Sequence, residues 1–171
     1  MRCRGCKTAT IREDLRSSDD HVQTIYKPPR LWTRSPVWIH RLEELDDNIY
    51  NLLVEVYSAA NDEQFRLLAM GVRAVLDHIM TRIVGDIGSF NQKLSEMVTQ
   101  AHISQRQKEM LDIVIDAGSA AAHRGYKPPR DLLEQMVAVM ETIVREHYIT
   151  GPMLETMKTM IPPRPPRNPP Q

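Results

Sequence analysis

Apolar residues recur at spacings of three and four along most of this chain, the period of a helix that buries one face. The pattern predicts a long first helix that starts at Ser35-Pro36 and ends near Asn61, because Ser caps helices well and Pro fits their first turn. Its apolar positions are Trp38, Leu42, Leu45, Ile49, Leu52, Val56 and Ala59.

A second helix is predicted after Asn61 or Asp62, either of which can cap it, and it should stop before Gly85 or Gly88. A short amphipathic segment over 91–100 follows. A later helix is expected to begin at Asp131 and to be broken at Gly151-Pro152, with a brief helical turn over 153–160 beyond the break.

The stretch from Ser104 to Arg124, SQRQKEMLDIVIDAGSAAAHR, has the clearest start signal. Ser104 and Gln107 have the spacing of a capping box. An apolar stripe then gives way to the small residues 118–122, which either let another backbone approach closely or leave a groove beside His123. Either outcome makes this stretch a contact surface.

These elements predict an all-α fold, an antiparallel bundle of four to five helices. Residues 1–35 are expected to form an irregular N-terminal arm, residues 36–160 the helical domain, and residues 161–171 a proline- and arginine-rich tail that is disordered or polyproline II. The pentapeptide YKPPR occurs at 26–30 and at 126–130, but the flanks differ, so it indicates two similar turns or a coincidence, not a structural repeat.

Composition narrows the class of protein. The 171 residues are 42% hydrophobic, enough for one domain with a real core, and 22 basic residues balance 22 acidic ones. The chain therefore has no net positive charge that would attract nucleic acid or an anionic membrane. Any contact with phosphate must come from a local group of basic residues. Two cysteines, no signal-peptide pattern and no long apolar run favour a cytoplasmic protein that does not enter a membrane.

The run from Phe65 to Asp77, the segment Phe90 to Val98 and the ending Asp116 to His123 together resemble a bacterial family of unknown function that is similar to the HEPN superfamily of helical nucleotide- and RNA-associated domains. Members of that family often begin with a small zinc ribbon, to which the Cys3-x-x-Cys6 pair is similar. The resemblance implies a HEPN-like bundle that pairs into a homodimer, with the His-bearing helices facing each other and the Gly118 to Ala122 surface giving the close approach.

Active HEPN proteins are metal-independent RNases in which an Arg lies a few residues before a His, so that a base removes the ribose 2′-hydroxyl proton while a cation stabilises phosphate charge. The resemblance places His123 at the His position, with Gly118 and Ser119 as binding positions. No Arg stands at the expected spacing. Arg73 and Arg124 are the candidates to supply the cation.

Each of these residues also has an ordinary structural interpretation. His123 can stabilise the negative end of its helix, and Arg73 can form an ion pair with Asp77 one turn on or with a residue on another helix. Cys3 and Cys6 have the spacing of zinc ligands but lack a second pair, so the alternatives are a zinc site completed by His21 or by another subunit, a degenerate ribbon, or redox chemistry.

Two C-terminal patterns remain. The tail over 162–167 fits a P-x-x-P-x-R ligand, although a solvated tail is the plainer interpretation. The methionines near the C-terminus are interpreted as core filling, with a binding face as the alternative; they are Met136, Met140, Met153, Met157 and Met160.

The sequence thus predicts a non-catalytic, dimerising interaction module of a bacterial defence or nucleic-acid-processing system, without a cofactor. The alternatives are a metal-independent RNase with His123 as base, and a binder of RNA or nucleotides without turnover.

Overall fold

A computed structural model describes residues 11–16, 22–27 and 36–162 of the chain. In this part of the chain the helical elements follow one another in the order η1 (Val37–Arg41, a 3-10 helix), α1 (Leu42–Leu45), α2 (Asp47–Asn61), α3 (Phe65–Val84), α4 (Phe90–Thr99), α5 (Gln105–His123), α6 (Arg130–Arg145), η2 (Glu146–Thr150, a π turn) and α7 (Gly151–Met160). The predicted all-α bundle is confirmed.

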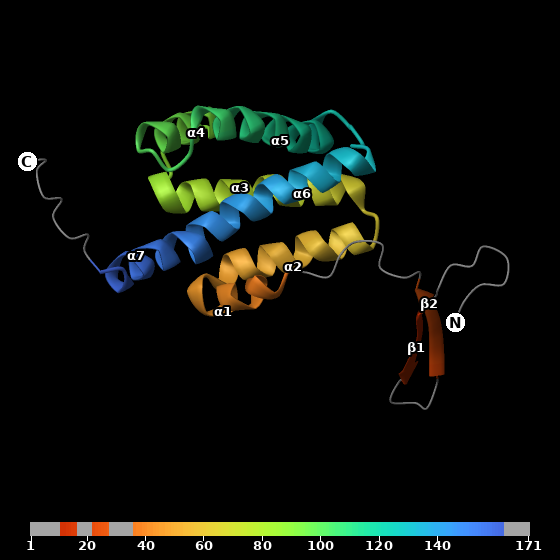
Figure 1. The fold of residues 1–171 in the computed structure, drawn as a ribbon. Coiled ribbons are helices and arrows are strands. Elements are labelled where there is room, and N and C mark those ends of the chain that lie inside the picture. Colours follow the sequence, from red (N-terminus) through yellow and green to blue (C-terminus); the bar gives the residue numbers. More distant parts are fainter. Residues whose placement is uncertain (1–10, 17–21, 28–35, 163–171) are drawn as a thin grey trace, which may run out of the picture.

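Helix α3 is the centre of the bundle. It packs against α2, α4, α5 and α6, and Figure 1 shows α4 and α5 above it, α6 beside it and α1 and α2 below it. Its buried residues Leu68, Val72 and Ile79 are fully shielded from solvent. The core therefore surrounds α3 on most sides.

Two glycines allow the helices around α3 to approach closely. A Cβ atom at Gly71 would lie 2.8 Å from Cγ2 of Val56 on α2. A Cβ atom at Gly118 on α5 would lie 2.7 Å from Cβ of Arg73 and 2.9 Å from the carbonyl oxygen of Ala69. The small-residue surface of α5 thus packs against α3 of the same chain, so its expected use as the close approach between two subunits is wrong for Gly118.

The helix starts follow side-chain caps where the sequence provides them. Ser104 and Gln107 form the predicted capping box at α5, and Ser89 and Gln92 form a second one at α4 that the sequence reasoning missed. Helix α3 ends before Gly85, which has φ +84°, as predicted. Neither Asn61 nor Asp62 caps α3, because Asn61 belongs to α2 and Asp62 is the C-cap of α2. Gln64 stands at the N-cap of α3 and forms no side-chain cap hydrogen bond.

The predicted long first helix is wrong, because the chain breaks at Asp46. This residue has φ −160° and ψ 93°, and its side chain accepts a hydrogen bond from the backbone N–H of Ile49 at 3.2 Å. Asp46 therefore acts as the N-cap of α2. An apolar stripe cannot reveal such a break, since it continues with nearly the same period on both sides.

The predicted break at Gly151-Pro152 is also wrong. The backbone of Gly151 is helical, with φ −59° and ψ −55°, and its N–H donates to the carbonyl of Glu146. This wider π turn carries the chain from α6 into α7, and Pro152 falls in the first turn of α7, where its missing N–H is tolerated.

The N-terminal arm, expected to be irregular, contains a hairpin that the sequence reasoning missed. Strands β1 (Ile11–Arg16) and β2 (Val22–Lys27) pair antiparallel, with Ile11 opposite Lys27 and Arg16 opposite Val22. The signal was the β-forming sequence of residues 22–26, which includes Val, Thr, Ile and Tyr.

Several predictions lie outside the described residues. They concern Cys3, Cys6 and His21 as metal ligands, Ser35 as a cap, and the tail from residue 163 onward. In the second YKPPR, which links α5 to α6, Pro128 is buried and Arg130 begins α6. Within the described part of the chain, no helix combines the length and apolar character that a membrane crossing requires.

Candidate functional site

His123 is the last residue of α5 and is exposed to solvent. The backbone N–H groups of Arg124 and Tyr126 both donate to the carbonyl of Ala120, at 3.0 and 3.2 Å, and close the end of the helix. Among the residues that the structure describes, no group forms a hydrogen bond or ion pair with the His123 ring. Ser119, one turn earlier, is half-buried.

Arg73 lies where α3, α4 and α5 meet. Its guanidinium carbon is 4.3 Å from the centre of the Phe90 ring, a cation–π contact, and its stem fills the space opposite Gly118. The predicted ion pair with Asp77 is not formed. Asp77 instead binds the buried Lys93 at 2.9 Å, and Lys93 also donates to Thr81 at 2.8 Å.

Arg124 turns back along the surface of α5. Its Nη2 donates to Oδ1 of Asp116 at 2.6 Å and lies 3.3 Å from the Asp116 carbonyl oxygen. Both side chains are exposed, at 59% and 72%. Arg124 is therefore paired with Asp116, whereas Arg73 lies against Phe90 and its buried Nε has no hydrogen-bond partner among the described residues. Neither arginine side chain forms a hydrogen bond with His123.

The structure contains a polar cluster that the sequence reasoning missed, centred on Asp46. The side chain of Asp46 is only 6% exposed. Its Oδ2 accepts hydrogen bonds from Nε2 of His78 at 3.1 Å and from the hydroxyl of Tyr148 at 2.7 Å, and Nε of Arg82 lies 3.4 Å away. One carboxylate thus joins the α1–α2 break, helix α3 and the π turn.

The environment of Asp46 keeps it ionised. Burial by itself raises the pKa of a carboxyl group, but the hydrogen bonds from Tyr148, His78 and the Ile49 N–H outweigh it and lower the pKa of Asp46 from 3.8 to about 2. Burial and the bond to Asp46 raise the pKa of Tyr148 above its usual range. An ionised carboxylate only accepts, so Nε2 of His78 carries the proton that it donates.

His147 lies edge-on to the Tyr148 ring, with 4.7 Å between the ring centroids. Burial lowers the pKa of His147, and electrostatic interactions with His102 and Arg82 lower it further. The negative charge of Asp46 acts in the opposite direction but does not cancel the shift.

The described residues include no group of three or more His, Cys, Asp or Glu that could hold a metal ion. With Tyr148, His78, Arg82 and the Ile49 N–H around its carboxylate, Asp46 is suited to fixing the π turn against α3.

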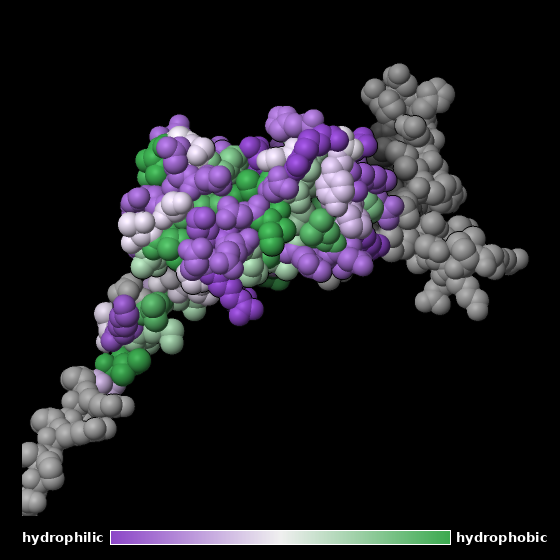
Figure 2. Space-filling view, turned by 90° about the horizontal axis from the view of Figure 1, so that it is seen from above, coloured by the Kyte–Doolittle hydropathy of each residue, from purple (hydrophilic) through white to green (hydrophobic). Residues whose placement is uncertain are grey.

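The π turn also sets the direction of α7, which extends away from the bundle (Figures 1 and 2). The substantial contacts of α7 are with η2. Apolar side chains cover its surface, with exposed fractions from 51% to 77%; they are Met153, Leu154, Met157 and Met160, followed by Ile161 at 67%. We call these five residues the α7 face.

The methionines divide between two roles. Met136 and Met140 on α6 are fully buried, so core filling is confirmed for them. Met153, Met157 and Met160 are exposed on α7, so core filling is wrong there. The reason is that α7 extends away from the bundle. The prediction of a helix break at Gly151 gave no indication of that direction.

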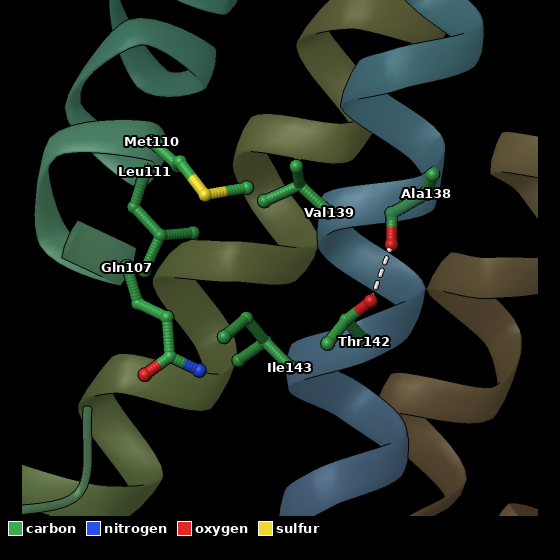
Figure 3. Close-up of a pocket in the computed structure, with 7 residues that line it drawn as sticks. All are labelled: Gln107, Met110, Leu111, Ala138, Val139, Thr142 and Ile143. Atoms are coloured by element: carbon green, nitrogen blue, oxygen red, sulfur yellow. Dashed lines mark hydrogen bonds between the residues drawn. The ribbon is translucent and has the colours of Figure 1, made fainter. Parts of the chain in front are cut away.

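A shallow apolar groove of about 200 Å³ lies between α5 and α6. Figure 3 shows side chains of both helices converging on it: Gln107, Met110 and Leu111 from α5, and Ala138, Val139, Thr142 and Ile143 from α6. We call it the α5–α6 groove. The sequence pattern did not reveal it, because Met110 continues the apolar stripe of α5 and is expected in the core, whereas the structure leaves it 43% exposed.

The fold and these surfaces define a class of protein, an all-α helical bundle with an exposed apolar helix at its C-terminal end. The chain belongs to the family described as "Domain of unknown function (DUF4145)", which matches residues 54–162. The match starts within α2 and extends through α7. No curated protein and no solved structure matches the chain.

Proposed function

We propose that this chain is a non-catalytic interaction module that forms a homodimer, built on a HEPN-like bundle and serving a bacterial defence or nucleic-acid-processing system. The observation that carries the proposal is the α7 face. Four apolar side chains on one ten-residue helix, each at least half exposed, form the kind of surface that soluble proteins cover with a partner. Met-rich helix faces are common at such contacts.

The surroundings of the predicted catalytic residues support the non-catalytic part. A cation that stabilises phosphate charge must be free to face the substrate. Arg73 instead lies against Phe90 with its stem packed on α5, and Arg124 is paired with Asp116. The competing function is a metal-independent RNase with His123 as the general base.

Two measurements test the proposal. Light scattering at micromolar concentration should give about twice the chain mass of 19.7 kDa; a monomer at every concentration would refute the dimer. Incubation with RNA in the absence of metal should give no cleavage. Cleavage by the wild-type protein that disappears in His123→Ala would establish the RNase instead.

A further inference from the structure

Arg73 is a half-buried arginine whose charge has no acidic partner in the described part of the chain. Its Nε atom is shielded from solvent and forms no hydrogen bond with the described residues. The two Nη nitrogens also lack a partner there, but they are not among the buried atoms, so they face solvent. A guanidinium that has lost water on one side without gaining an acceptor is poorly stabilised, and an anion at its open edge would compensate for that loss.

The carboxylates nearest to Arg73 in the fold are engaged elsewhere. Asp77, one turn along α3, lies 2.9 Å from Nζ of the buried Lys93, and the same Nζ lies 3.4 Å from Asp86. On α5, Asp116 is exposed and forms an ion pair at the surface. The acids on neighbouring elements therefore do not neutralise Arg73, although Asp77 has the spacing to do so.

The guanidinium is held in place before any ligand binds. A Cβ atom at Gly118 would lie 2.7 Å from Cβ and 3.2 Å from Cδ of Arg73, so the arginine stem fills the space that the glycine leaves on α5. The guanidinium carbon lies 4.3 Å from the centre of the Phe90 ring. A ring over a guanidinium covers one face of its plane, whereas the N–H bonds point along the edge of that plane. Arg73 can thus offer its Nη edge with little further loss of side-chain freedom.

The local charges favour a ligand with a single negative charge. Lys93, Asp77 and Asp86 together carry one net negative charge on the same side of the bundle. A phosphate group, with a charge of roughly −1.5 to −2, would be repelled by that excess, whereas a carboxylate brings one charge to the one charge of Arg73. The two oxygens of a carboxylate also match two N–H donors of the guanidinium fork. The site therefore suits a carboxylate better than a phosphate.

This position is separate from the predicted catalytic histidine. His123 is five residues beyond Gly118, which is roughly 7.5 Å along α5 at ~1.5 Å per residue, and its ring is exposed at the end of the helix. A general base must lie within hydrogen-bond reach of the proton that it removes. A ligand held by Arg73 is therefore bound without a base beside it, as the proposed non-catalytic function requires.

We propose that Arg73 anchors a binding site for a carboxylate ligand where α3, α4 and α5 meet, with its two Nη groups donating to the two carboxylate oxygens (Figure 1 shows the three helices). A small organic acid and the C-terminus of a peptide present this same group. The site goes beyond the proposed interaction module, and it does not depend on the homodimer, because all of its groups come from one chain.

The test is a titration of the isotope-labelled full-length protein with sodium acetate at constant ionic strength, followed through the arginine Nε–H signals in NMR spectra. Acetate should shift the Arg73 signal saturably, with a dissociation constant on the order of millimolar, because two charge-assisted hydrogen bonds carry the binding. Acetamide, which has the same shape without the charge, should give no saturable shift. Inorganic phosphate should bind at least fivefold more weakly than acetate. N-acetylalanine, which ends like a peptide chain, is titrated beside acetate, and the tighter of the two shows whether the site prefers a chain terminus or a free acid.

Two variants identify the Arg73 signal. Arg73→Lys keeps the charge but lacks the fork, and Phe90→Leu removes the ring over the guanidinium, so the signal is lost in the first and displaced in the second. Acetate should raise the Tm of the wild-type protein but not that of Arg73→Lys. Arg66→Lys, at an exposed arginine of the same helix, is the matched control and should respond to acetate as the wild type does. Circular dichroism checks the folding of each variant.

An Arg73 signal that does not shift saturably with acetate or N-acetylalanine would refute the site. A signal that responds equally to acetamide or to phosphate would refute the carboxylate ligand, and so would an Arg73→Lys protein that acetate stabilises as much as the wild type. If Arg73→Lys does not fold, Phe90→Leu still assigns the signal and the wild-type titrations decide. A monomer that binds acetate would contradict the proposed homodimer but not this site, whereas a dimer that does not bind it would contradict the site alone.

Discussion

Asp46 connects three elements that are far apart in the sequence. It caps α2 through the N–H of Ile49, binds His78 on α3 and binds Tyr148 in the π turn. A buried carboxylate is unfavourable unless its oxygens accept hydrogen bonds, and here they do. The cluster around Asp46 thus stabilises the fold at the point where α7 departs.

Replacing Asp46 with Asn should lower the free energy of unfolding by about 2–3 kcal/mol, because hydrogen bonds to a buried charge are worth about 1.5–3 kcal/mol and an amide cannot accept all of them. Urea unfolding followed by circular dichroism measures the change. The exposed neighbour Asp47 provides the control, since Asp47→Asn should change stability by less than about 0.5 kcal/mol. Equal effects of the two substitutions would contradict the role of the cluster.

The same groups predict how stability depends on pH. The pKa of Asp46 falls from 3.8 to about 2 on folding, so its ionised form contributes about 2 kcal/mol above pH 4, and this is lost as the pH falls toward 2. The pKa of His147 is also lowered from 6.5, so below pH 6.5 the unfolded chain binds a proton at this residue more readily than the folded one, and stability falls. Urea unfolding across this range should show both losses. Asp46→Asn should remove the lower one, and His147→Gln the upper one.

At the scale of the elements, caps and periodicity predict where regular helices run. Ser104 and Gln107 located the start of α5, and the apolar stripe located α3, because both signals are local in sequence. The break at Asp46 and the π turn were not predictable in this way. The hydrogen bond that joins them links Asp46 to Tyr148, residues 102 positions apart, which a local signal cannot reveal.

Gly151→Ala tests the π turn directly. In an ordinary helix this change stabilises by about 0.5–1 kcal/mol. Here the new Cβ atom would lie 2.8 Å from the carbonyl oxygen of Glu146, so the turn must shift, and we expect a loss of about 1–3 kcal/mol. Thr156→Ala, on the exposed surface of α7, serves as the control and should be neutral or slightly stabilising. A stabilised Gly151→Ala protein would show that the π turn is not required.

At the scale of the whole molecule, the sequence predicted the bundle but not its exposed surfaces. His123, Arg73 and Arg124 stood out because of their chemistry, yet the two arginines contact Phe90 and Asp116 instead of His123. The α7 face and the α5–α6 groove were hidden because Met157 and Met110 read as core residues in an amphipathic pattern. Which apolar stripe stays exposed is decided by how the helices pack, here by the π turn that directs α7 outward.

The proposed homodimer predicts that thermal stability depends on protein concentration. Mass action stabilises a folded dimer by about 1.4 kcal/mol for each tenfold rise in concentration, about 0.7 kcal/mol per chain. For a chain of this size the midpoint Tm should then rise by roughly 1–3 °C per tenfold step, as scanning calorimetry from about 2 to 200 µM can measure.

Met157→Glu, on the α7 face, should flatten this dependence of Tm on concentration, and Leu67→Glu, on α3 and equally exposed, should retain it. Added salt should not weaken the effect, because the contacts are apolar and the chain is formally neutral. A wild-type Tm that stays constant over the whole range would rule out a dimer that dissociates on unfolding.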